Sequence, residues 1–273
     1  DPVYMDVPVV DETRCTGCRA CSEMCQFKAI AVLAGKAMVF AEMCHGCGGC
    51  LAVCPEQALF HGRRELGEVE LGRSGEVPVV TGRLRVGEAM SPPLIRAARA
   101  RLRAVRAGRS FDDDPSYDSG DDLKKERSGQ ELGQGLEPAP DAIMPPIMDA
   151  VVDAPPGVSC PAVNAVQDAD VILLVAEPTP FGLHDFALAW EAFKPLGRPV
   201  AVAVNRAGLG DGELKAFCAR QGLPVLAEIP FDRAIARAYS EGRVISELGG
   251  ELRRTFENLR DGLRALHGEV RHD

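Results

Sequence analysis

The sequence predicts an α/β fold, with a parallel doubly wound sheet that follows a small, cysteine-rich α+β domain. Two observations predict it. Eight of the ten cysteines lie between residues 15 and 54, and such clustering indicates a site for metal or cofactor. Beyond residue 148, short apolar segments alternate with segments of helix length, which is the pattern of a parallel sheet covered by helices. A chain of 273 residues is long enough for about two domains.

The clustered cysteines form two runs with the same spacing, C-x2-C-x2-C-x3-C, and Pro55 follows the second run. This is the spacing of bacterial-type 2[4Fe-4S] ferredoxins, in which the fourth cysteine of each run ligates the other cluster. The runs start 29 residues apart, at Cys15 and Cys44, so this domain is an internal repeat. The expected ligands are Cys15, Cys18, Cys21 and Cys54 for one [4Fe-4S] cluster, and Cys44, Cys47, Cys50 and Cys25 for the second.

Three alternative roles for the cysteines have weaker support. Structural zinc sites use pairs of cysteines separated by a longer loop, whereas these are triplets. A disulfide framework belongs to small secreted chains, and the sequence shows no secretory signal at its start. Burial alone does not account for eight cysteines within 40 residues.

The first 147 residues are expected to divide into four segments. Residues 1–8 are expected to be an N-terminal remnant, and residues 9–62 the ferredoxin-like domain. Residues 63–108 are expected to return through short strands with glycine turns to a helix from Leu94 to Ala107, which Ser91 can cap. Residues 109–147 contain ten acidic and four basic residues, which predicts an acidic, flexible linker or surface loop.

The segment 148–273 is expected to hold the parallel sheet. In such sheets ligands bind at the carboxyl ends of the strands. Polar residues follow three of the predicted strands: Asp153 after the first, Asn205 and Arg206 after the third, and Asp232 after the fourth. The predicted strands are 148–152, 171–176, 199–204 and 224–228, and the predicted helices are 182–195, 211–221 and 247–267.

These strand ends, with the segments 153–161, 177–185 and 229–232, resemble the MinD/ParA/Mrp class of P-loop ATPases. In particular they resemble members that carry an inserted two-cluster ferredoxin domain. The resemblance implies a domain that binds ATP and Mg²⁺. It implies Asp153 as a Walker-B-like acid, Pro156 and Gly157 as the second switch, Asn205 and Arg206 as readers of the base, and Pro230 and Asp232 as residues flanking the nucleotide.

One motif of that class has no counterpart here, since none of the six lysines follows a Gly-rich turn between a strand and a helix. Such a loop supplies the backbone N–H groups and the lysine that hold the phosphates. The nucleotide-binding fold is therefore expected to be incomplete at the N-terminus, and ATP dependence requires a Walker A segment upstream. The chain by itself is predicted not to hydrolyse ATP.

The leading functional prediction is an electron-transfer protein whose two [4Fe-4S] clusters are coupled to a nucleotide-binding domain. Alternatives are a simple ferredoxin with a non-hydrolysing scaffold domain and, ranked last, an Mrp-like carrier of iron–sulfur clusters. A redox partner protein is expected, and the resemblance adds a homodimer through the nucleotide-binding face. The formal net charge of −9 disfavours nucleic acid as a partner. No apolar run is long enough for a membrane span, and a cytoplasmic location is expected.

Overall fold

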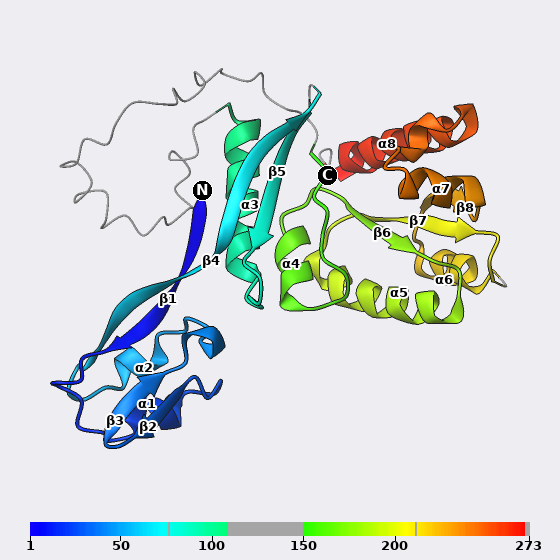
Figure 1. The fold of residues 1–273 in the computed structure, drawn as a ribbon. Coiled ribbons are helices and arrows are strands. Elements are labelled where there is room, and N and C mark those ends of the chain that lie inside the picture. The colour runs from blue at the N-terminus through cyan, green and yellow to red at the C-terminus, as the bar shows by residue number, and fades with distance from the viewer. Residues whose placement is uncertain (76, 109–149, 211, 271–273) are drawn as a thin grey trace, which may run out of the picture. The chain divides into compact units, whose positions relative to one another are not determined.

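The computed structural model describes residues 1–75, 77–108, 150–210 and 212–270 (Figure 1). The chain divides into two compact units, residues 1–151 and 152–273. The predicted acidic linker at 109–147 lies outside the described residues.

The first unit is built on an antiparallel sheet in the order β1 (Pro2–Val10), β4 (Leu59–Ser74) and β5 (Val77–Leu84). Alternate residues of β1 point to one face, so Val3, Met5 and Val7 are buried. At one end of this face Val3 packs against helix α3 (Pro92–Arg106). At the other end Met5 and Val7 pack against the segment that contains Cys44. The same sheet face therefore supports both α3 and the cysteine-rich domain.

Three predictions for this unit are wrong. Residues 1–8 are not a remnant, because β1 pairs with β4 from Pro2 to Val10, and the expected boundary at residue 62 lies inside β4. Strands β4 and β5 form one long hairpin that ends at Leu84, rather than several short strands. Gly67 lies within a strand, where a Cβ would come within 2.1 Å of the carbonyl oxygen of Arg83. This glycine therefore permits close approach of two strands instead of marking a turn.

The cysteine-rich domain has little regular structure. It contains the hairpin of β2 (Ile30–Leu33) and β3 (Lys36–Val39), a short 3-10 helix, η1 (Ala41–Met43), and two one-turn helices, α1 (Ala20–Met24) and α2 (Gly49–Ala52). Its small apolar core combines two of the cysteines with three apolar side chains: Cys21, Ile30, Ala37, Cys50 and Leu59.

The second unit contains a three-stranded parallel sheet in the order β6 (Ile172–Ala176), β7 (Val200–Ala207) and β8 (Val225–Pro230). Apolar residues fill the strands, and Val200 to Val204 of β7 are all buried. The helices are α4 (Cys160–Val166), α5 (Pro180–Phe193), α6 (Glu213–Gln221), α7 (Arg233–Ser240) and α8 (Gly250–Val270), with 3-10 turns at Lys194–Leu196 and Ile245–Glu247.

Helices pack on both faces of this sheet. The alternate residues Ile172 and Leu174 of β6 share one core with side chains of α4, α5 and α6. In β8, Val225 joins that core, while its neighbour Leu226 contacts Gly262 of α8. Since successive residues of a strand point to opposite faces, α8 covers the face opposite to α5 and α6, as Figure 1 shows.

The strand expected at 148–152 is not supported where it is described. Residues 150–152 are irregular, and the side chain of Val151 is almost fully exposed, so it has no sheet to pack against. Residues 148 and 149 lie outside the described residues. Helices α4 and α7 were not expected, because each is only seven or eight residues long.

Candidate metal centres and strand-end site

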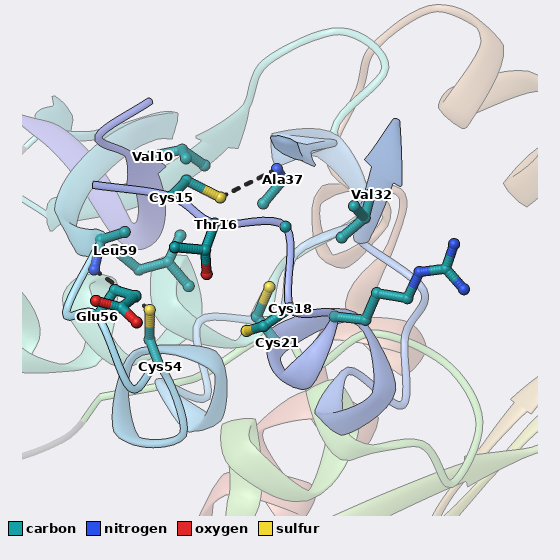
Figure 2. Close-up of a pocket in the computed structure, with 13 residues that line it drawn as sticks. Val10, Cys15, Thr16, Cys18, Cys21, Val32, Ala37, Cys54, Glu56 and Leu59 are labelled. Atoms are coloured by element: carbon teal, nitrogen blue, oxygen red, sulfur yellow. Dashed lines mark hydrogen bonds between the residues drawn. The ribbon is translucent and has the colours of Figure 1, made fainter. Parts of the chain in front are cut away.

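Two cavities in the first unit gather the clustered thiols, four in each. The first is lined by Cys15, Cys18, Cys21 and Cys54 (Figure 2). The second is lined by Cys25, Cys44, Cys47 and Cys50. In each cavity three thiols come from one run and the fourth from the other, which are the two sets that the sequence predicts.

The two runs have the same backbone conformation. Cys21 and Cys50 lie on α1 and α2 and are buried, whereas Cys18 and Cys47 lie in exposed loops. Left-handed backbone recurs at positions 29 residues apart, and non-glycine residues adopt it at several of them. The matching positions are Gly17 with Gly46, Arg19 with Gly48, and Lys28 with Gln57.

Two glycines allow the loops to lie against neighbouring backbone. A Cβ on Gly17 would come within 2.4 Å of the carbonyl oxygen of Gly35, in the β2–β3 turn. A Cβ on Gly46 would come within 3.0 Å of the carbonyl oxygen of Asp6 on β1. The first loop is thus held by a hairpin and the second by the central sheet.

Backbone N–H groups point at the sulfur atoms. Ala29 donates to Cys25 Sγ and Ala58 donates to Cys54 Sγ, both at 3.3 Å and again 29 residues apart. Ala37 donates to Cys15 Sγ and Gly46 to Cys44 Sγ, both at 3.4 Å. Hydrogen bonds of this kind are typical of the sulfur ligands in iron–sulfur sites.

Burial opposes ionisation at two of the thiols. Desolvation raises the pKa of Cys21 and, in the other run, of Cys50. A bound metal would have to displace these protons. Among the described residues, no group of three or more His, Cys, Asp or Glu side chains is placed to hold a single metal ion. The thiols surround each cavity rather than meeting at one point.

Outside the thiols, the two cavities differ. In the second, the rings of Phe27 and His45 stack with centroids 3.6 Å apart and planes 6° from parallel. The repeat-related positions in the first cavity are Thr16 and Glu56 (Figure 2). No local signal in the sequence indicates that His45 stacks on a side chain of the other run.

In the second unit, the carboxyl ends of the strands bring several predicted residues together. Arg206, at the end of β7, forms an ion pair of 3.3 Å with Glu177, which follows β6. The backbone of Arg206 is left-handed, and its N–H donates to Asn205 Oδ1. The end of β8 joins this edge, because Ala207 pairs with Pro230.

The remaining predicted nucleotide residues have simpler surroundings. Asp232 accepts a hydrogen bond from the N–H of Ala234 and so caps α7. Asp153, Pro156 and Gly157 lie in an irregular segment before α4, and Asp153 is exposed. Asp153 does not follow a described strand, so its expected position as a strand-end acid is not supported.

Comparison with known proteins bears on the first unit. Residues 7–55 match the 4Fe-4S dicluster domain family. This segment is therefore similar to 4Fe-4S dicluster domains. Over 54 residues the chain is 41% identical to a subunit of the ion-translocating oxidoreductase complex of Methanosarcina acetivorans, and the match covers 20% of each chain.

Two relatives in Methanocaldococcus jannaschii carry no functional name. The uncharacterized protein MJ0579 is 34% identical over 92 residues, which is 34% of this chain and 31% of that protein. The uncharacterized protein MJ0578 is 22% identical over 262 residues, covering 96% of this chain and 76% of that protein. The match thus spans under a third of one of these relatives and about three quarters of the other.

Among solved structures, the cell division ATPase MinD of Pyrococcus furiosus is similar over 42% of this chain and 50% of that chain. The sequence identity is 26% and the TM-score 0.36. Within the described part of the chain, no helix combines the length and the apolar character that crossing a membrane requires.

Proposed function

We propose that this protein transfers electrons through two [4Fe-4S] clusters. One is held by Cys15, Cys18, Cys21 and Cys54, and the other by Cys25, Cys44, Cys47 and Cys50. The observation that carries the proposal is the composition of the two cavities, each with three thiols from one run and one from the other. That crossed arrangement is the ligand pattern of two-cluster ferredoxins.

The surrounding residues suit such a cofactor. The N–H donors to sulfur and the two close-packed glycine loops provide a polar, tightly wrapped site. When bound, a [4Fe-4S] cluster supplies one-electron transfer. The exposed loops at Cys18 and Cys47 bring one side of each cavity to the surface, where a redox partner protein can dock.

For the second unit we propose a MinD/ParA-like nucleotide-binding domain that binds ATP and Mg²⁺ weakly by itself and becomes ATP-dependent only with a Walker A segment. Its support is the meeting of three parallel strand ends at Glu177, Asn205–Arg206 and Pro230, where ligands bind in open α/β sheets. Asn205 and Arg206 would face the base, with Pro230 and Asp232 beside it. We propose that Asp153, Pro156 and Gly157 lie on the phosphate side of the nucleotide. We also propose that the protein forms a homodimer through this nucleotide-binding face.

A scaffold role for the second unit is the alternative, and two contacts favour it. The Arg206 guanidinium is already paired with Glu177, and Asp232 already caps α7. Both residues thus have structural roles that require no nucleotide.

The cluster proposal is tested by anaerobic purification followed by iron and sulfide analysis and by electron paramagnetic resonance (EPR) after reduction. We expect about eight irons per chain, as two [4Fe-4S] clusters require. About four irons, or stoichiometric zinc, would contradict the proposal.

The nucleotide proposal is tested separately, by titrating the protein with a fluorescent ATP analogue and Mg²⁺. We expect weak binding that Asn205→Ala reduces and Asn258→Ala, at an exposed position on α8, leaves unchanged. Equal binding by both variants and the wild type would support the scaffold alternative.

A further inference from the structure

Each run of cysteines is held at its start by one cation. Lys36 Nζ donates to the carbonyl oxygens of Glu12 at 2.7 Å and Cys15 at 2.6 Å. Arg64 Nη1 donates to the carbonyl oxygen of Ala41. Glu12 and Ala41 are repeat-related, and each lies three residues before the first cysteine of its run. The two cations come from different strands, β3 and β4, so the sequence repeat does not reveal them.

Both cations act close to the first cysteine. The N–H of Cys44 donates to the same carbonyl oxygen of Ala41 that Arg64 binds, at 3.1 Å. On the other side, Lys36 binds the carbonyl of Cys15 itself, and the N–H of the next residue, Ala37, donates to Cys15 Sγ. Each cation therefore holds the backbone that orients one thiol.

The surroundings of the two cations differ in charge. Arg64 is buried and pairs with Glu88 at 3.2 Å, and each of these side chains is only 10% exposed. Glu88 is held in turn by the N–H of Met90. Lys36 is exposed, and the carbonyl oxygens to which it donates carry no formal charge. Lys36 thus adds a positive charge beside the first cavity, while the charge of Arg64 beside the second is balanced by Glu88.

The remaining charged groups that line the cavities do not reverse this difference. Arg19 and Glu56, of opposite sign, line the first cavity. Of the residues that line the second cavity, Asp6 alone is an Asp, Glu, Lys or Arg, and it adds a negative charge there. Counting these lining residues together with Lys36, the first cavity carries a net positive charge and the second a net negative one.

We propose that Lys36 and the Arg64–Glu88 pair are positioning residues for Cys15 and Cys44, and that they give the two clusters different reduction potentials. This inference rests on the proposed electron-transfer function. Reduction adds negative charge, which a nearby cation stabilises, so net local charge shifts the potential. The group held by the first cavity has the higher potential, and electrons settle there.

The test is a redox titration of the anaerobic holoprotein followed by EPR, with the two signals assigned from Cys18→Ser and Cys47→Ser. Lys36→Gln is expected to shift the first-cavity potential downward and leave the second unchanged, while Lys36→Arg restores it. Glu88→Gln leaves the Arg64 charge unbalanced and is expected to shift the second-cavity potential upward. Arg83 on β5 and Glu70 on β4 form an exposed ion pair of 3.1 Å. Arg83→Gln and Glu70→Gln therefore serve as matched controls.

Failure of the proposed function and failure of this inference give different results. A wild type without about eight irons contradicts the proposed function. The inference about Lys36 is overturned if two normal clusters form and Lys36→Gln changes neither potential or shifts both together. Either result leaves the proposed function standing. Lys36 is exposed, so its variant decides the matter even if Glu88→Gln, at a buried ion pair, fails to load its site.

Discussion

At the scale of single residues, the central feature is that the fourth thiol of each cavity comes from the other run. Two substitutions in one cavity should therefore cost no more iron than one, because the cluster is already lost. We expect Cys18→Ser with Cys54→Ser to retain about four irons, and Cys18→Ser with Cys25→Ser to retain almost none.

Iron analysis with EPR on the anaerobic proteins checks this prediction. The control is Cys47→Ser combined with Cys25→Ser, which removes two thiols of the second cavity and should also retain about four irons. The opposite result would be loss of one cluster in Cys18→Ser with Cys25→Ser and of both clusters in Cys18→Ser with Cys54→Ser. It would show that each cluster takes all its ligands from one run.

The two cysteines outside the cavities should differ in reactivity. Cys218 on α6 is buried, and desolvation raises the pKa of its thiol, whereas Cys160 is exposed. The thiolate is the reactive form, and a raised pKa lowers its fraction at any pH below that pKa. In the folded holoprotein at neutral pH, we expect an alkylating reagent to modify Cys160 and to leave Cys218 unmodified until the protein unfolds.

Peptide mass spectrometry after short pulses of reagent measures both sites at once. Equal modification of the two thiols in the folded protein would show that α6 opens readily.

At the scale of secondary-structure elements, the loop before α1 depends on Gly17. Gly17→Ala places a side chain in left-handed backbone, which costs about 1 kcal/mol, and against a carbonyl oxygen 2.4 Å away. Overpacking of this kind adds roughly 1–3 kcal/mol. Gly48→Ala has the same backbone cost with open space around the new methyl group, so it should be clearly milder.

The denaturant midpoint for loss of iron–sulfur absorbance compares the two variants. Arg19 occupies the position related to Gly48 by the repeat and already has a positive φ, which is a natural precedent for the control. Equal midpoints would mean that the hairpin does not hold the Cys15 loop.

Also at this scale, the apolar segments predict the three described parallel strands well. Each observed strand, β6, β7 and β8, starts one residue after its predicted start. The prediction fails where the pattern is weaker. Residues 150–152 are apolar but irregular, because an apolar run becomes a strand only where a neighbouring strand completes its hydrogen bonds.

At the scale of the whole molecule, residues 1–273 by themselves are expected to lack Mg²⁺-dependent ATPase activity. Hydrolysis needs phosphate-facing N–H groups and a lysine at the β- and γ-phosphates, and none of the six lysines follows a Gly-rich strand–helix turn. Phosphate release from the purified chain measures this, with Asp153→Asn as the matched variant. Activity that Asp153→Asn abolishes would reveal a phosphate site that the sequence motifs do not predict.

The sequence by itself determined the similarity of residues 7–55 to dicluster domains and the alternation of strands and helices in the second unit. Both are local properties: cluster ligation depends on cysteine spacing, and a buried strand depends on an apolar run. The proposed ligand sets follow from the same spacing, and they stay a prediction until iron is measured.

Only the tertiary structure decided which ordinary residues surround those thiols. Lys36, Arg64 and Glu88 belong to common residue types far apart in the sequence, as do the stacked rings of Phe27 and His45. Strand β4, which carries Arg64, pairs with β1, whose first residues looked like a remnant. Contacts of this kind depend on interactions between residues far apart in the chain. The sequence alone does not distinguish a solvated lysine or arginine from one that donates to a carbonyl oxygen beside a ligand.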